Sequence, residues 1–285
     1  MTILVTGGNG QLGCSLRLAS AESCNHFVFT DIEELDITSA SDVEEFFERE
    51  KIDVVVNCVA YTAVDLAEDN EAKADDINHK AVALLATTCK RYNATLIHIS
   101  TDYIFSGNAD TPYTEECNAA PLNAYGRTKL AGERAVVESG CKSIILRTSW
   151  LYSEFGRNFV KTMRELTIKC PEIKVVADQI GTPTYAGDLT AAIIHIIDSE
   201  QLSKTGIYHF SNLGECSWYD FATEIAHQCD NIDCKITPCT TADYPTKALR
   251  PRYSVLDKGK FLSTFSFAIP EWKEPLERCM AILKK

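Results

Sequence analysis

A short apolar run that ends in closely spaced glycines constrains this chain more than any other feature. Residues 2–13 read TILVTGGNGQLG, with Gly7, Gly10 and Gly13 directly after the apolar run. Glycines at this spacing permit a tight turn, close approach of a pyrophosphate and close packing of helix on strand. The N–H groups that open the following helix favour an anion. The pattern predicts a strand, a dinucleotide-binding turn and a helix; a turn that serves only packing is the alternative.

The first half of the chain alternates short β-branched runs with longer amphipathic segments. Strands are expected at 2–7, 27–31, 53–57, 95–101 and 143–148, and helices near 11–20, 41–50, 71–91 and 124–139. Strands that are apolar almost throughout are typical of parallel sheets covered on both faces. The alternation predicts an α/β fold with a doubly wound, Rossmann-like parallel sheet and a second, smaller α/β lobe.

The pattern loosens after about residue 150. We expect a dinucleotide-binding domain at 1–150 and a mainly substrate-binding lobe at 151–285, with some segments returning to the first domain. A strand followed by a turn-rich segment is expected at 173–184. Helices are expected near 186–198 and 217–229, with IYHFSN (207–212) between them. The last 45 residues contain TPCTTADYPTKALRPRYS, rich in Pro and Thr, and are expected to be mostly loop.

Composition narrows the classes of function. The 285 residues carry a formal net charge of -12 with no basic cluster, which argues against nucleic-acid binding. No apolar run approaches the ~18 residues of a membrane helix, and the N-terminus is no secretory signal, so a cytoplasmic location is expected.

The 12 cysteines are then expected to be reduced. The five-residue spacing of Cys229, Cys234 and Cys239 near His227 matches no common zinc pattern, and no metal is expected.

Two acidic residues follow the second expected strand. Asp31 ends FVFTD, 18 residues beyond Gly13, where a carboxylate can accept a hydrogen bond from an adenosine ribose 2′-OH. It would repel a 2′-phosphate, and no cation follows it in DIEELD, so it favours NADH over NADPH. Asp36 either caps the helix at 41–50 or contacts adenine, and the cap is favoured because Asp and Ser cluster there.

Tyr125 and Lys129 are spaced to act together. On a helix, residues i and i+4 share one face. A free tyrosine has a pKa of about 10; the Lys129 ammonium and an oxidised nicotinamide ring would lower it toward neutrality. Tyr125 would then supply the proton for ketone reduction, and Gly126 would let the helix lie close to cofactor or sheet. Thr101, at a strand end where such sheets bind ligands, would hold the carbonyl oxygen, or else cap a turn.

These residues resemble those of a known superfamily. GxxGxxG at 7–13, Thr101 and YxxxK at 125–129 resemble the extended short-chain dehydrogenase/reductases. Finer motifs resemble the dTDP-4-dehydrorhamnose reductases nearly from end to end. They are GGNGQLG (7–13), NCVAYTAVDLAE (57–68), STDYIFSG (100–107), PLNAYGRTKLAGE (121–133), LRTSWLY (146–152), DQIGTPT (178–184) and LRPRYSVLD (249–257). The resemblance implies reduction of the C4 ketone of dTDP-4-dehydro-L-rhamnose with NADPH or NADH.

The resemblance also implies roles for individual residues. Tyr125 would be the proton donor, Lys129 its partner and ribose ligand, and Thr101 the hydrogen-bonding partner of the carbonyl. Cofactor contacts would come from Gly7, Gly10, Gln11, Leu12, Gly13, Asp31, Asp36, Ile37, Ala60, Tyr61, Thr62, Tyr125 and Lys129. The sugar nucleotide would contact Thr101, Asp102, Trp150 and Arg250, the last at its diphosphate.

Two positions depart from related patterns. Ser15 stands where some members carry a Glu that binds magnesium at a dimer contact, so monomer and homodimer both remain open. Tyr103 stands where the similar dehydratases carry a catalytic Glu. The remaining alternatives are another nucleotide-sugar epimerase or reductase, and a non-catalytic subunit resembling the regulatory subunit of methionine adenosyltransferase. The intact set of Thr101, Tyr125 and Lys129 favours catalysis.

Overall fold

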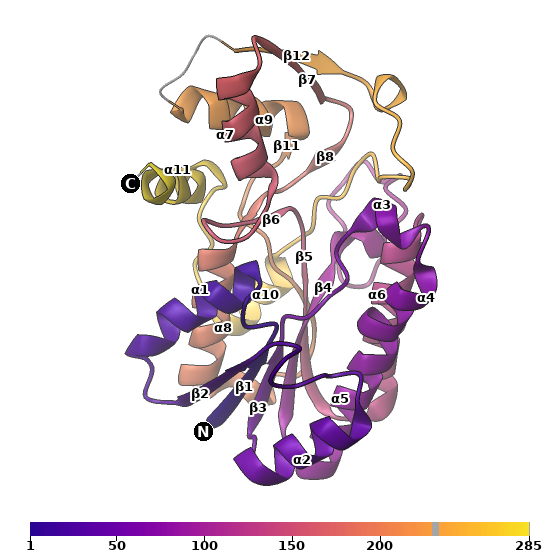
Figure 1. Ribbon diagram of the computed structural model, residues 1–285, viewed down its shortest axis with the longest axis vertical. Coiled ribbons are helices and arrows are strands. Elements are labelled where there is room, and N and C mark those ends of the chain that lie inside the picture. The colour runs from indigo at the N-terminus through magenta and orange to yellow at the C-terminus, as the bar shows by residue number, and fades with distance from the viewer. Residues whose placement is uncertain (230–233, 285) are drawn as a thin grey trace.

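The computed structural model describes residues 1–229 and 234–284. Its centre is a six-stranded sheet in the order β10-β5-β4-β3-β1-β2, in which every pair is parallel (Figure 1). The strands are β1 (Thr2–Thr6), β2 (His26–Thr30), β3 (Val54–Asn57), β4 (Thr95–Thr101), β5 (Lys142–Thr148) and β10 (Gly206–His209). The predicted doubly wound parallel sheet is confirmed, because helices cover both of its faces.

Alternate residues of β1 contribute to two separate cores. Ile3 and Val5 face α1 (Gln11–Ala19), α8 (Ala186–Asp198) and α10 (Gly259–Phe265). Leu4 belongs to the opposite core with residues from α2 (Ala40–Glu50), α5 (Ala81–Tyr92) and α6 (Ala124–Ser139). Successive side chains of a strand point to opposite faces, so one apolar pentapeptide anchors both helical layers. Figure 1 shows α1 and α8 on one side of the sheet and α5 and α6 on the other.

The helix expected at 71–91 is divided into three parts. It consists of α4 (Glu71–Asp75), a π-helical turn (Asp76–Lys80) and α5. Within the turn, Asn78 bonds the backbone N and O of Tyr61 and the hydroxyl of Thr128 on α6. A Cβ at Gly132 would collide with the Asn78 carbonyl oxygen. The π turn therefore brings the start of α5 into close contact with α6, and such turns are frequent near functional sites.

Segments beyond residue 150 divide between two regions. β10 pairs with β5 at the edge of the six-stranded sheet, and α8 and α10 pack against one face of that sheet. The others enclose a smaller core around the parallel pair β7–β12. They are α7 (Phe159–Lys169), β7 (Glu172–Val176), α9 (Trp218–Gln228), β12 (Lys235–Cys239) and α11 (Lys273–Leu283). The short elements are α3 (Val64–Ala67), β6 (Leu151–Tyr152), β8 (Ile180–Gly181), β9 (Thr184–Tyr185), β11 (Cys216–Ser217) and 3₁₀ turns at 20–22, 102–104, 201–203 and 241–243.

The expectation of loop over the last 45 residues was wrong in part. The segment around 241–258 is irregular, but α10 and α11 follow it. Phe261 and Phe265, one helical turn apart, are buried against the sheet. Pro275 lies in the first turn of α11, where its missing N–H has no intrahelical partner to lose. The Pro and Thr content of the neighbouring loop concealed two short amphipathic helices.

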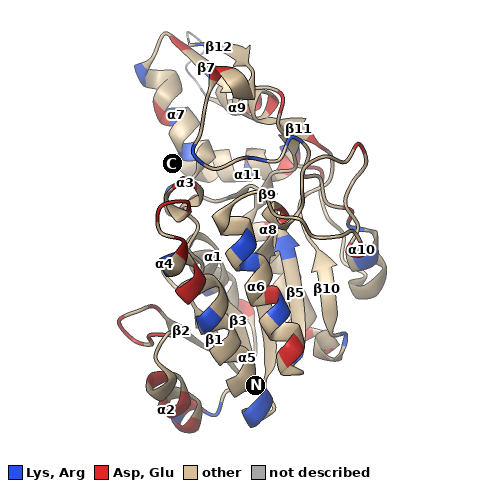
Figure 2. Ribbon diagram, turned by 90° about the vertical axis from the view of Figure 1, so that its right-hand side faces the viewer, with Lys and Arg blue, Asp and Glu red and all other residues tan. Residues whose placement is uncertain are grey.

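Charge is distributed unevenly over the surface. In Figure 2 the ribbon of α2 is largely acidic, whereas basic and acidic positions are interspersed along α6. None of the described helices is long and apolar enough to cross a membrane.

Candidate active site

A cavity of about 540 Å³ lies where the strands of the sheet end. Open α/β sheets bind ligands at this edge, because successive loops and helix N-termini meet there. The lining residues come from the glycine loop, the ends of β3, β4 and β5, the start of α6, and the segments around 156, 218 and 250. They are Gly10, Gln11, Leu12, Cys58, Ala60, Thr62, Val64, Ile99, Ser100, Thr101, Asp102, Tyr103, Tyr125, Lys129, Thr148, Ser149, Trp150, Leu151, Gly156, Arg157, Trp218 and Arg250.

The glycine loop shapes one end of the cavity. Gly7 has φ +70, and a Cβ at Gly13 would collide with the Gly7 carbonyl oxygen, so both positions require glycine. Helix α1 starts after Gly10 with no side-chain cap, which leaves its first N–H groups open to a ligand. Gly10, Gln11 and Leu12 line the cavity, whereas Gly7 and Gly13 do not line it and form the turn itself. This arrangement fits an approaching pyrophosphate.

The side chain of Gln11 already has partners within the protein. Its Oε1 accepts hydrogen bonds from Ser153 Oγ at 3.1 Å and from Asn158 Nδ2 at 2.9 Å. Asn158 also caps α7 by accepting a bond from the Lys161 N–H. Gln11 therefore ties the glycine loop to the 153–158 turn that precedes α7.

Three predicted cofactor residues follow β2, outside the cavity lining. Asp31 Oδ2 accepts a hydrogen bond from the Asn9 N–H at 3.1 Å, so this carboxylate lies at the glycine loop. Ile37 is buried in the core. The expectation that Asp36 caps the helix at 41–50 was wrong: Ser39 caps α2, and Asp36 binds the N–H and hydroxyl of Thr38. The Asp36 carboxylate accepts these hydrogen bonds from a residue two positions away and therefore does not cap the helix.

The segment after β3 forms another wall. Ala60 and Thr62 line the cavity. Tyr61 is not among its lining residues. Asn78 forms hydrogen bonds with both its backbone N and O, and its side chain packs against the cluster of Ala67, Ala74 and Ala124.

Gly126 allows α6 to begin directly against the end of β4. A Cβ at this position would collide with the carbonyl oxygen of Tyr103. Asn123 caps the helix by accepting a hydrogen bond from the Gly126 N–H at 2.8 Å. The close approach places Tyr125 edge-on to the Tyr103 ring, with centroids 5.6 Å apart. The glycine noted in the sequence is thus needed for contact between helix and turn.

Thr101 caps the turn that follows β4, which is one of the two roles considered for it. Its Oγ1 accepts a hydrogen bond from the Tyr103 N–H at 3.2 Å, which caps the 102–104 turn, and donates to Asp102 at 3.1 Å. Its side chain also forms a hydrogen bond with Tyr125. Burial raises the pKa of Asp102 to about 6, opposed by hydrogen bonds with Ser254 and Thr101. The strand end therefore presents a polar cluster directly to the phenol.

The pKa of Tyr125 departs from the expectation. Burial raises it well above the ordinary value, while the hydrogen bond with Thr101 acts in the opposite direction. Lys129 is not among the groups that lower the pKa of Tyr125, contrary to the expectation. Its ammonium donates to the Ile99 carbonyl at 2.6 Å. Burial also lowers the pKa of Lys129 to about 8, opposed mainly by the charge of Glu133. A phenol with a raised pKa retains its proton at neutral pH, as a proton donor must.

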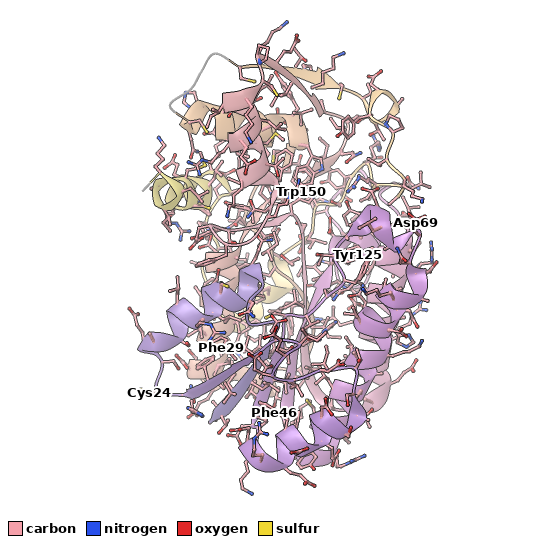
Figure 3. The ribbon with its side chains drawn as sticks, in the orientation of Figure 1. Cys24, Phe29, Phe46, Asp69, Tyr125 and Trp150 are labelled. Carbon is pink, nitrogen blue, oxygen red and sulfur yellow. The ribbon has the colours of Figure 1, made fainter. Side chains whose placement is uncertain are left out.

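Two tryptophans line the same cavity as the phenol. Trp150 has φ +48, unusual for a bulky residue, and its ring stacks on Trp218 with centroids 3.6 Å apart. A Cβ at Gly181 would lie 2.6 Å from the Trp150 ring. Figure 3 shows Trp150 between the sheet and the smaller core, with Tyr125 at the start of α6. Trp218 was missed in the sequence; the only signal for it is its place directly after the Ser217 helix cap.

Two arginines from different segments line the cavity. Arg250 donates to the Tyr103 hydroxyl at 3.0 Å and to Asp65 at 2.6 Å. Its guanidinium is thus partly neutralised by a carboxylate that sequence reasoning did not identify. Arg157 was also missed, because a lone Arg in a turn gives no pattern to recognise.

Comparisons with known proteins identify the family of this chain. Residues 1–285 match the model of the family described as RmlD substrate binding domain. The dTDP-4-dehydrorhamnose reductase of Aggregatibacter actinomycetemcomitans is 40% identical over 98% of both chains. A crystal structure of a dTDP-4-dehydrorhamnose reductase from Clostridium acetobutylicum is 42% identical, covers 100% of both chains and superposes with a TM-score of 0.95. The dTDP-4-dehydrorhamnose reductase from Bacillus anthracis, solved in complex with NADP, is 38% identical over 100% of this chain and 99% of its own, with a TM-score of 0.91.

The family model spans the whole chain, and relatives near 40% identity cover nearly all of it. The chain belongs to the RmlD substrate binding domain family, whose members similar to it include dTDP-4-dehydrorhamnose reductases.

Proposed function

We propose that the protein reduces the C4 ketone of dTDP-4-dehydro-L-rhamnose to dTDP-L-rhamnose. The observation that carries this proposal is the convergence of Thr101, Tyr125 and Lys129 on one cavity, whose other end is the open N-terminus of α1. A hydride source and a proton source are needed on the same carbonyl. When bound, the nicotinamide cofactor supplies the hydride.

The side chains supply the proton and hold the reactants. Tyr125 donates its phenolic proton to the developing alkoxide. The Thr101 hydroxyl, turned from Asp102 toward the substrate, donates a hydrogen bond to the same oxygen. Lys129 holds ribose hydroxyls of the cofactor, and the hydrogen bond with Thr101 stabilises the phenolate that remains. The two stacked tryptophans, which line the same cavity, cover the sugar and exclude water.

A second cavity, about 660 Å³, adjoins the first and shares Trp218 and Arg250 with it. Its apolar lining, with Phe159, Met163 and Leu166, suits the nucleoside, while Arg250 lies between the two cavities. We infer from this a division of labour: residues 1–150 bind the cofactor, and residues 151–285 mainly bind the sugar nucleotide, apart from β10, α8 and α10.

The protein is expected to bind both NADPH and NADH. Asp31 suits the 2′-OH of NADH. Arg17 stacks over Phe29 at 4.4 Å, and its Nη2 lies 3.0 Å from where a Gly8 Cβ would be, so a cation is close to the end of β2. This cation comes from α1, not from the segment after β2, and it would offset the charge of a 2′-phosphate. The protein would accept NADPH or NADH.

The test mixes purified protein, NADPH or NADH, and dTDP-4-dehydro-L-rhamnose, and follows the ultraviolet absorbance of the reduced nicotinamide. We expect its loss, with dTDP-L-rhamnose identified as the product by nuclear magnetic resonance. Cofactor binding without oxidation would favour a regulatory subunit, and a product epimerised without oxidation would favour an epimerase. The enzyme would act in the cytoplasm on a free small molecule, as a monomer or homodimer.

A further inference from the structure

Arg157 is a cation of the cavity to which no role has been given. It belongs to the turn between β6 and α7 and lines the cavity together with Gly10, Gln11 and Leu12. Within residues 1–229 and 234–284 its guanidinium has no ion pair and no hydrogen bond. Its side chain is exposed toward solvent and the cavity.

The other cations of the lining differ in this respect. Lys129 is 1% exposed and donates to the Ile99 carbonyl. Arg250 is paired with Asp65 and with the Tyr103 hydroxyl. Among the described lining residues, Arg157 is therefore the guanidinium whose charge and donors remain available to a ligand. A guanidinium presents paired N–H groups that match phosphate oxygens.

The backbone that carries Arg157 is fixed, although its side chain is free. Gln11 Oε1 accepts bonds from both Ser153 and Asn158. Gly156 has φ +57, and a Cβ there would lie 3.2 Å from Gln11 Cγ, so this residue rests directly on the glycine-loop side chain. Residue 157 consequently stays beside the N-terminus of α1, where a pyrophosphate is expected.

We propose that Arg157 binds a diphosphate in this cavity, chiefly the pyrophosphate of the dinucleotide beside Gln11. The inference rests on the proposed function for the presence of that ligand. A diphosphate carries two negative charges, while the open helix N-terminus offers only about half a positive charge. Arg157 supplies the missing charge. The diphosphate of the sugar nucleotide is the other source of the same chemistry.

The test measures affinity by isothermal titration calorimetry for NADPH, NADH and dTDP separately, with wild-type protein, Arg157→Gln and Arg157→Lys. We expect Arg157→Gln to raise the Kd of NADPH and NADH alike, about tenfold, because their pyrophosphates are identical. The Lys variant should recover part of the loss. Arg49→Gln removes an exposed cation from α2, at the far end of the molecule, and should change none of the three values.

The outcomes separate the two ligands and the two proposals. A raised Kd for dTDP alone assigns Arg157 to the sugar nucleotide, and diphosphate binding still stands. Unchanged Kd values for all three ligands, in a variant with wild-type thermal melting, overturn the inference. Wild-type protein that binds dinucleotide but does not reduce the ketosugar refutes the proposed function alone. Wild-type protein that binds neither dinucleotide nor dTDP overturns both.

Discussion

Burial and hydrogen bonding act against each other on the reacting phenol. Burial raises the pKa of Tyr125, and the hydrogen bond with Thr101 lowers it. Tyr125→Phe removes only the hydroxyl and keeps the edge-on contact with Tyr103. We expect kcat to fall about 10²-fold or more, the usual range for a general acid, with an unchanged melting temperature. Steady-state kinetics and thermal melting measure this, and near-wild-type kcat would eliminate Tyr125 as proton donor.

Asp102 lies beside the catalytic residues and carries a stability cost. Burial raises its pKa from 3.8 to about 6. Between these values the folded state keeps a proton that the unfolded state has released, so the free energy of unfolding falls as pH rises. Asp102→Asn abolishes this titration and should gain stability relative to wild type between pH 4 and 7, by at most about 3 kcal/mol.

Urea unfolding of both proteins across that range measures the difference. Asp110→Asn, at an exposed carboxylate that is in water in both states, should give a nearly constant offset. A stability difference between wild type and Asp102→Asn that does not change with pH would contradict the assignment.

At the scale of elements, the start of α6 and the end of β4 form one unit. Gly126→Ala raises helix propensity by about 1 kcal/mol, yet its Cβ would collide with the Tyr103 carbonyl. The helix must shift, and small displacements of catalytic groups can cost about 10²-fold in rate. We expect a stability loss of about 1–3 kcal/mol, typical of overpacking, together with a clear fall in kcat.

Ala131→Gly, in the same helix, controls for propensity alone and should cost about 1 kcal/mol with little change in kcat. Unfolding and kinetics of both variants decide the matter. A Gly126→Ala protein that is more stable and fully active would show that the helix does not need this close contact.

At the scale of the whole molecule, a buried ion pair joins elements that are distant in sequence. Glu133 on α6 accepts bidentate hydrogen bonds from Arg147 Nε and Nη2 on β5. Arg147 Nη1 also forms a hydrogen bond with His209 Nε2 on β10. Both charged side chains are almost fully buried. Glu133→Gln leaves Arg147 uncompensated and should cost about 3–5 kcal/mol. The double variant with Arg147→Met should recover much of this in urea unfolding, and an equally unstable double variant would argue against a charge effect.

Much of the fold follows from local pattern. The five expected strands became β1–β5 within a residue or two, because short apolar runs rich in β-branched residues are typical of buried strands. The split of 71–91 by a π turn was not visible, since it arises where Asn78 meets the Tyr61 backbone and Thr128. The helices α10 and α11 were missed because their apolar spacing is short and lies beside a Pro-rich loop.

By itself, the sequence determined the glycine turn, the individual strands of the sheet and the shared helical face of Tyr125 and Lys129, all of which depend on residues within a few positions of one another. Tertiary structure decided the rest: the stacking of Trp218 on Trp150, the pairing of Arg250 with Asp65, and the place of Arg157 at the glycine loop. It also decided the direction of the Tyr125 pKa, because burial depends on segments far apart in the chain. Spacing along one helix specifies which side chains share a face, but only packing specifies how much water and which charges reach them.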